Sequence, residues 1–122
     1  MGTRMVSSEE SPVHENWKQA ILQASETDTV FLNRFHSPGL RALRTDKTTR
    51  LEKQTESNAM AEFGTAADLY FGGDMEASIA LTGQVCGRID EICSVKNIIA
   101  DIAREFDEVL QSMASRYITK HP

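Results

Sequence analysis

The chain has 122 residues, of which 40% are hydrophobic and 25% charged, and its formal net charge is −5. This size and composition predict one ordinary globular domain with a buried core. Acidic and basic residues are interspersed along most of the sequence, which argues against nucleic acid or an anionic membrane as the main partner, because both require a clustered basic surface. The sequence shows neither a long apolar run nor a secretory signal pattern, so we expect a cytoplasmic protein.

The N-terminal segment, residues 1–7, is predicted to be the end of an apolar strand followed by a turn. Its Gly2-Thr3 step would then lie where the strand ends. Backbone N–H groups at such a turn, together with the Thr3 hydroxyl, are the donors that a phosphate monoester requires. The alternative is a plain strand end with Arg4 at the surface.

A helix and a pair of short strands are predicted next. Ser11 as N-cap and Pro12 at the first helical position indicate the start of the helix. Residues 29–35 are rich in β-branched and aromatic side chains, which favours a strand. After a turn at residues 36–39, residues 40–44 are predicted to return as a second strand. We expect helices to cover this pair, because a lone hairpin is marginal in water.

Two further segments are predicted to be helical before the chain breaks. Residues 46–58 are polar, and residues 59–71 carry an apolar stripe at helical spacing. The glycines of residues 72–74 end this part of the chain.

A stretch of small residues follows and contains the second candidate site, Gly83-Gln84. A glycine lets a backbone come close to a ligand, and the Gln84 side chain offers both a donor and an acceptor. The other interpretation, which the local chemistry favours, is close packing of Gly83 and Gly87 against a neighbouring element.

The clearest element is a helix that begins after Ser94 and runs to about residue 117, roughly 35 Å in length. Its apolar residues step by three and four, and the stripe requires a surface to pack on. The stripe consists of Val95, Ile98, Ile99, Ile102, Phe106, Val109, Leu110 and Met113. The polar face carries mostly acidic residues, which is the wrong sign for an anionic lipid surface.

The histidines and cysteines are candidates for chemistry, but their spacing does not support it. His14 and His36 each have the properties of a general base, yet no nucleophile stands at a matching spacing, so we interpret both as surface residues. Cys86 and Cys93 are too few for a disulfide framework and are not spaced as zinc ligands. We therefore expect small buried thiols and no metal site.

Several stretches together point to a known family. They are Met1-Gly2-Thr3-Arg4, Glu9-Glu10-Ser11-Pro12-Val13-His14, Trp17-Lys18, Glu26-Thr27-Asp28-Thr29, Leu40-Arg41-Ala42-Leu43-Arg44, Gly73-Asp74, Thr82-Gly83-Gln84-Val85-Cys86-Gly87 and Val95-Lys96-Asn97-Ile98-Ile99. In this order and at these separations, they resemble the nitronate monooxygenase family, formerly called 2-nitropropane dioxygenases. The resemblance covers essentially the whole chain.

The resemblance implies an α+β, mostly helical fold: the C-terminal part of an FMN-binding (β/α)8 barrel protein that carries its small α/β domain. Residues 1–8 would be the end of a late barrel strand and a phosphate-binding turn. Residues 9–71 would form the small helical domain with its two-stranded element. Residues 72–122 would be a return segment and C-terminal helices that pack on the barrel.

The same resemblance implies a function and a set of site residues. Met1, Gly2 and Thr3 would bind the phosphate of FMN, as loops after the late strands of such barrels do. Gly83 and Gln84 would lie toward the substrate pocket. The full-length enzyme would oxidise alkyl nitronates with molecular oxygen, and a flavin-dependent enoyl-ACP reductase of the same superfamily is the alternative.

The family's catalytic base limits what this chain is expected to do by itself. That base is a histidine that matches neither His14 nor His36, and its region precedes the residues present in this sequence. We therefore expect the isolated chain to be catalytically inactive, to bind FMN weakly or not at all, and to self-associate. A non-catalytic helical interaction module is the alternative from a different class, because the long apolar stripe requires a partner surface.

Overall fold

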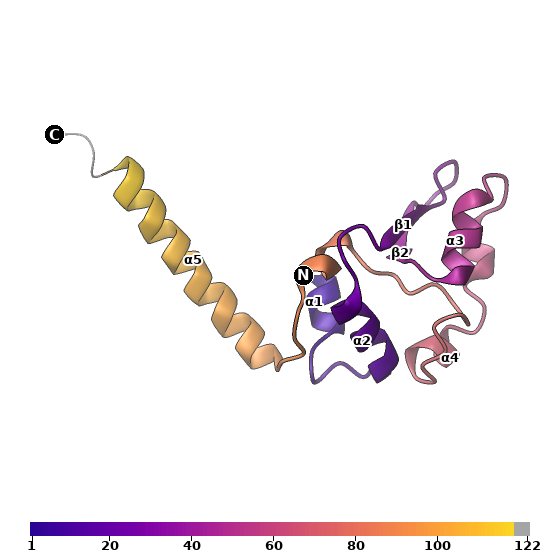
Figure 1. Ribbon diagram of the computed structural model, residues 1–122, viewed down its shortest axis with the longest axis horizontal. Helices are drawn as coiled ribbons and strands as arrows, with labels where there is room; N and C mark the ends of the chain where they lie inside the picture. The colour runs from indigo at the N-terminus through magenta and orange to yellow at the C-terminus, as the bar shows by residue number, and fades with distance from the viewer. Residues whose placement is uncertain (119–122) are drawn as a thin grey trace. The chain divides into compact units, whose positions relative to one another are not determined.

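The computed structural model describes residues 1–118, which form two compact units, Met1–Ile92 and the segment from Cys93 onward (Figure 1). The last four residues of the predicted C-terminal segment, 119–122, lie outside the described residues. The described elements are α1 (Gly2–Val6), α2 (Glu15–Gln23), β1 (Thr29–Leu32), β2 (Leu40–Leu43), α3 (Asp46–Lys53), the 3-10 helix η1 (Ala59–Glu62), α4 (Ala66–Tyr70), the 3-10 helix η2 (Gln84–Arg88) and α5 (Val95–Tyr117).

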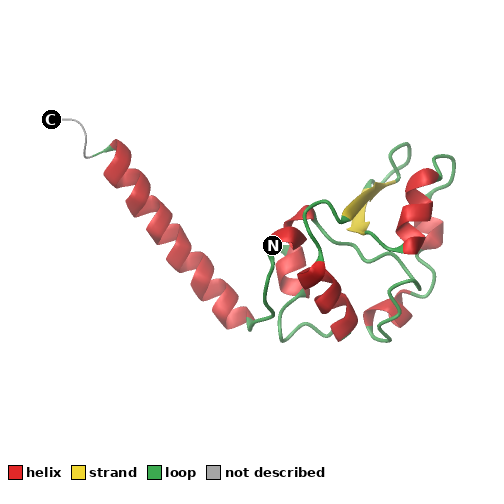
Figure 2. Cartoon of the chain, viewed as in Figure 1, coloured by secondary structure: helices red, strands yellow, loops and turns green. Residues whose placement is uncertain are grey.

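The expected α+β, mostly helical fold with a two-stranded element is confirmed (Figure 2). Strands β1 and β2 pair antiparallel, from Thr29 opposite Leu43 to Leu32 opposite Leu40. Strand β1 is shorter than predicted because Asn33 adopts a positive φ of 60°. The Asn33 side chain donates to the Pro38 carbonyl (3.0 Å) and accepts from the Ala59 N–H (2.6 Å), so it closes the turn that follows the strand.

Residues 80–82 extend the pairing along the second edge of β2, which the sequence did not predict. Leu81 forms an isolated antiparallel bridge with Ala42. The Thr82 N–H donates to the Arg41 carbonyl (3.1 Å), and the Leu43 N–H donates to the Ala80 carbonyl (3.0 Å). This pairing places the segment that leads to Gly83 beside the sheet.

Two buried clusters hold the first unit together. One contains Trp17, Ile21, Leu43, Leu69, Ala80, Cys86 and Ile89. The other contains Val30, Leu32, Leu40, Ala42, Leu51, Ala59 and Ile79, under α3, which lies against β1. Because β2 supplies Leu43 to the first cluster and Leu40 and Ala42 to the second, its burial does not follow a simple alternation. The Trp17 and Tyr70 rings pack edge to face, with centroids 4.9 Å apart.

The predicted strand end at residues 1–7 is wrong, because Gly2–Val6 is a helix. The Met5 N–H donates to the Met1 carbonyl (3.1 Å) and the Ser7 N–H to the Thr3 carbonyl (3.2 Å), which closes successive turns. A short apolar run fits a strand and a helical turn equally well, so periodicity gave no means of distinguishing them. The division of the chain at residues 8 and 71 refers to a barrel and stays a prediction.

The predicted helix start at Ser11 and Pro12 is also wrong. Helix α2 begins at Glu15, and the Nδ1 atom of His14 caps it by accepting from the Asn16 N–H at 3.1 Å. The Ser11 N–H instead donates to the Ser8 carbonyl in the preceding turn (3.3 Å).

The helical stripe predicted over residues 59–71 is interrupted. Gly64 has a φ of +54°, which a side chain rarely adopts, and a Cβ there would lie 2.8 Å from the Ala77 carbonyl oxygen. The segment therefore divides into η1 and α4, and Met60 is exposed.

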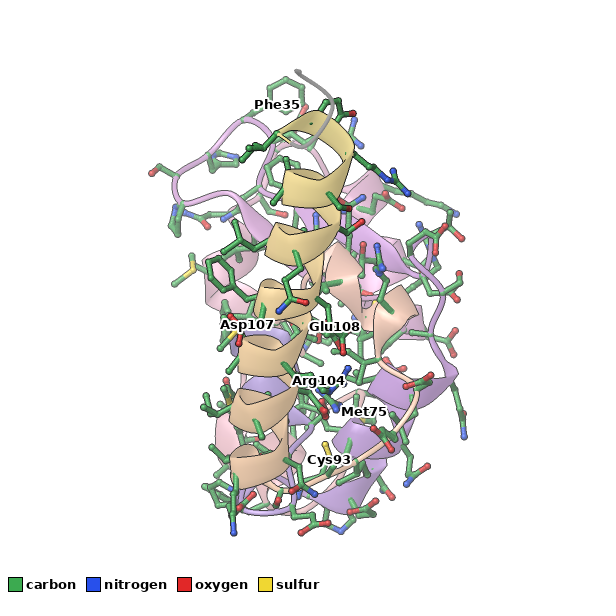
Figure 3. The ribbon with its side chains drawn as sticks, turned by 90° about the vertical axis from the view of Figure 1, so that its left-hand side faces the viewer. Phe35, Met75, Cys93, Arg104, Asp107 and Glu108 are labelled. Carbon is green, nitrogen blue, oxygen red and sulfur yellow. The ribbon has the colours of Figure 1, made fainter. Side chains whose placement is uncertain are left out.

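Helix α5 matches its prediction at the N-terminus, where the Ser94 hydroxyl accepts from the Asn97 N–H at 3.2 Å. Most of its apolar stripe, from Ile99 to Met113, is 44% to 66% exposed. Arg104 donates to Asp101 (2.9 Å) and Glu108 (3.0 Å), and these bonds raise the pKa of its guanidinium. Arg104 and Glu108 are labelled on α5 in Figure 3. Within the described residues, no helix is long and apolar enough to cross a membrane.

Candidate functional site

The two predicted site segments meet at one hydrogen bond. The backbone N–H of Gly83 donates to the hydroxyl oxygen of Thr3 at 2.9 Å, across 80 residues of sequence. Thr3 lies in the first turn of α1, and Gly83 immediately precedes η2. The sequence assigned these residues to a phosphate site and a substrate pocket separately, and the structure brings them together.

The start of α1 is open and rich in backbone donors. Met1 is 70% exposed, and a Cβ placed on Gly2 would meet no atom within 4 Å. The first N–H groups of a helix have no partner inside the helix, and here the first such bond runs from Met5 back to Met1. The amides of Gly2 and Thr3 therefore precede the hydrogen-bonded ladder and have no acceptor inside the helix.

The segment before Gly83 is anchored by Thr82, whose role the sequence analysis missed. The Thr82 hydroxyl accepts from the indole N–H of Trp17 (3.3 Å) and donates to the Ala80 carbonyl (3.0 Å). Both Trp17 and Thr82 are buried. In the sequence, Thr82 was named only as the first residue of the stretch Thr82–Gly87 in the family resemblance, and nothing in its spacing indicated a bond to Trp17.

The residues after Gly83 have different roles. Gln84 begins η2 and is exposed, so its amide is available to a ligand. A Cβ on Gly87 would clash with the backbone of Ser25 and Glu26, so Gly87 is a glycine of close packing. The packing interpretation is thus confirmed for Gly87. For Gly83, a Cβ would come within 3.3 Å of the Thr3 hydroxyl oxygen.

Cys86 is the buried thiol of this region. Burial raises the pKa of Cys86, and its thiol lies 3.5 Å from the Ser25 carbonyl oxygen. Cys93 is partly buried, and neither cysteine forms a disulfide.

The two histidine candidates have local explanations. His14 caps α2, as described above, and the glycine at position 73 packs against its ring. His36 is exposed in the turn between the strands. Within residues 1–118, no recorded hydrogen bond joins His14 or His36 to Thr3 or Gly83.

A hollow elsewhere on the first unit does not include the predicted site. It is lined by Ala20, Gln23, Ala24, Asp28, Leu43, Arg44, Thr45 and Met75. Met1, Gly2 and Gln84 are exposed and Thr3 and Gly83 are partly exposed, so the predicted site residues lie at the surface of the first unit.

The comparison with protein families covers most of the chain, including both Thr3 and Gly83. The model of the nitronate monooxygenase family matches residues 1–105. This chain belongs to the nitronate monooxygenase family, a group of flavin-dependent oxidoreductases. The family predicted from the sequence is confirmed.

Two solved structures of FabK from Thermotoga maritima are similar to this chain. FabK is 36% identical with a TM-score of 0.85, and the match covers 95% of this chain and 39% of FabK. A methionine-to-alanine mutant of FabK is 34% identical with a TM-score of 0.79, over 95% of this chain and 36% of the mutant. This chain thus spans less than two fifths of their length. No curated protein matches the sequence.

Proposed function

We propose that the chain is the C-terminal part of an FMN-dependent oxidoreductase and that Met1, Gly2 and Thr3 hold the FMN phosphate. The observation that carries this proposal is the Gly83 N–H bond to the Thr3 hydroxyl, because it joins two family segments beside an open helix start. Residues 1–8 and the C-terminal helices would complete a (β/α)8 barrel, with residues 9–71 as its small domain.

The residues present fit a phosphate group. The amides of Gly2 and Thr3 begin a helix, the Thr3 hydroxyl lies beside them, and Gly2 has no side chain to fill the space in front. Phosphate oxygens accept from such backbone and hydroxyl donors. The side-chain amide of Gln84 would lie toward the substrate, together with Gly83.

We propose alkyl nitronate oxidation as the reaction of the full-length enzyme, with molecular oxygen as the second substrate. Bound FMN would supply the redox chemistry, accepting electrons from the nitronate carbanion and passing them to oxygen. The residues of this chain would bind and orient the cofactor. The family match over residues 1–105 supports this activity.

Enoyl-ACP reduction is the second candidate, because the two FabK structures are 34% and 36% identical to this chain. The two activities differ in their electron donor. In the full-length cytoplasmic enzyme, oxygen-dependent flavin reoxidation with a nitronate supports the first. NAD(P)H-dependent reduction of a crotonyl thioester, with no turnover of nitronate, would overturn nitronate oxidation and support enoyl-ACP reduction.

The isolated chain is proposed to be inactive and to self-associate, with neither nucleic acid nor membrane as a partner. The stripe of α5 supports self-association: Ile99, Ile102, Phe106, Val109 and Met113 step alternately by three and four residues, as in paired helices, and they are exposed. This surface also supports a non-catalytic interaction module. Gel filtration with flavin absorbance separates the possibilities. A stoichiometric yellow monomer would overturn the proposal that the chain is part of a larger barrel.

A further inference from the structure

We propose that Thr82 is a positioning residue, which orients the Thr3 hydroxyl toward a bound phosphate by fixing the Gly83 amide. This inference rests on the proposed phosphate site. Thr82 itself is buried, so it would not contact the phosphate directly. It acts through the peptide group that follows it, and Trp17 holds it in place.

The first step is the orientation of the Thr3 hydroxyl. A hydroxyl has one proton to donate and two lone pairs that accept. The Gly83 N–H occupies one lone pair at 2.9 Å, and within residues 1–118 this is the one hydrogen bond of that hydroxyl. Its proton is therefore directed away from Gly83 and remains available to an acceptor such as a phosphate oxygen.

The second step is the position of the Gly83 amide. This N–H belongs to the peptide group between Thr82 and Gly83, so it moves with Thr82. The backbone N–H of Thr82 donates to the Arg41 carbonyl on β2 (3.1 Å), and its hydroxyl is bonded to both Trp17 and Ala80. Residues of the buried core thus determine where the Gly83 amide points.

The third step is the space at position 83. A Cβ there would lie 3.3 Å from the Thr3 hydroxyl oxygen, which is a tight contact. Glycine therefore permits the close approach that the hydrogen bond needs. The anchoring by Thr82 and the absence of a side chain at Gly83 both serve this bond.

The experiment compares three substitutions in the full chain labelled with 15N. Thr82→Val removes the hydroxyl that Trp17 binds, and Thr82→Ser retains it. Thr29→Val is the matched control, because Thr29 is also a buried threonine whose hydroxyl accepts from a side chain, Arg41, at 3.1 Å. If Thr82→Val does not fold, Trp17→Phe takes its place, because this substitution removes the indole N–H and keeps an aromatic ring.

The first measurement is amide hydrogen exchange at Gly83, relative to Leu43, whose N–H bonds to Ala80. We expect Thr82→Val to speed the exchange of Gly83 about tenfold relative to Leu43, with Thr82→Ser and Thr29→Val close to the wild type.

The second measurement is a titration with FMN and with riboflavin, which lacks the phosphate. We expect Thr82→Val to weaken FMN binding roughly three- to tenfold, the scale of one lost hydrogen bond, and to leave riboflavin unaffected.

The outcomes separate this inference from the proposed function. Wild-type chain that binds riboflavin as tightly as it binds FMN would contradict the phosphate site itself. If Thr82→Val keeps the wild-type preference for FMN and its Gly83 amide is still protected from hydrogen exchange, the positioning role of Thr82 alone is overturned. An equal loss of FMN affinity in Thr29→Val would show a general effect of stability and would also overturn it.

Discussion

The N-cap of α2 shows how a single residue can override a strong sequence signal. Ser11 and Pro12 are residue types that commonly begin a helix. The N-cap of α2 is instead His14, three residues after Ser11. The backbone N–H of His14 donates to the Tyr70 carbonyl, 56 residues away, and Asn16 donates to the Gly73 carbonyl. Contacts so distant in sequence are invisible to local propensity, which is why this helix start was mispredicted.

Substitution of His14 tests this cap. His14→Ala removes the acceptor for the Asn16 N–H, and we expect the free energy of unfolding to fall by about 1 kcal/mol. His14→Asn retains an acceptor at the same position and should recover most of the loss. Urea denaturation followed by circular dichroism measures both. Equal stability of the Ala variant and the wild type would contradict the assignment of the cap.

Asp28 gives the fold a pH dependence. Its carboxylate accepts from the backbone N–H and the hydroxyl of Ser25, both at 2.8 Å, and these bonds, with a smaller contribution from the charge of Arg44, lower the pKa of Asp28 below its ordinary value of 3.8. In the folded chain this group releases its proton more readily than in the unfolded chain. Its contribution to stability is therefore complete above about pH 3.8 and is lost as the pH falls through the lowered pKa.

Asp28→Asn tests that sign. We expect the variant to be less stable than the wild type at pH 6, with a difference that shrinks as the pH is lowered below 3.8. Urea unfolding at a series of pH values measures the difference. A gap that stays constant down to pH 2 would show that the carboxylate is not the source of the stability.

At the scale of elements, the segments predicted well were those whose signals are local. The hairpin followed from its β-branched residues and turn, and α5 followed from Ser94 and a long apolar period. Two segments were predicted poorly for local reasons. Helix α1 is too short for its period to be recognised, and the positive φ of Gly64 interrupts the helix predicted over residues 59–71. The start of α2, in contrast, depends on distant contacts.

The candidate site was predicted only in part for the same reason. The residue types at Gly2-Thr3 and Gly83-Gln84 were compatible with ligand binding, but the local chemistry favoured close packing for Gly83, and the site prediction came from the family resemblance. Their direct contact came from the fold, because 80 residues separate the two segments. The supporting bond from Trp17 to Thr82 had no sequence signal at all.

The exposed stripe of α5 makes a prediction of its own. Phe106→Glu places a charge within the stripe, where Phe106 is 66% exposed, and we expect it to shift the isolated chain from oligomer to monomer. Gln111→Glu adds the same charge to the opposite face and should leave the oligomer unchanged. Sedimentation velocity measures both, and an unshifted Phe106→Glu profile would exclude this stripe as the contact surface.

At the scale of the whole molecule, the chain is a compact first unit with the open start of α1 at its surface, followed by a long helix. It matches FabK over 95% of its own length, and that match covers 39% of FabK. The proposed cofactor site would accordingly be one wall of a larger pocket. The phosphate donors that we propose, the amides of Gly2 and Thr3 and the Thr3 hydroxyl, all belong to this chain, so a preference for phosphate is expected where FMN binding is measurable.

The most direct test of this account is an NMR titration of the 15N-labelled 122-residue chain with FMN, set against riboflavin at matched concentration. The account predicts phosphate-dependent shifts of the Gly2, Thr3 and Gly83 amides, because FMN carries the group that these donors bind. Riboflavin should leave the three amides unmoved. FMN binding that leaves these amides unmoved, or equal shifts with riboflavin, would contradict the central claim that this chain holds the cofactor phosphate.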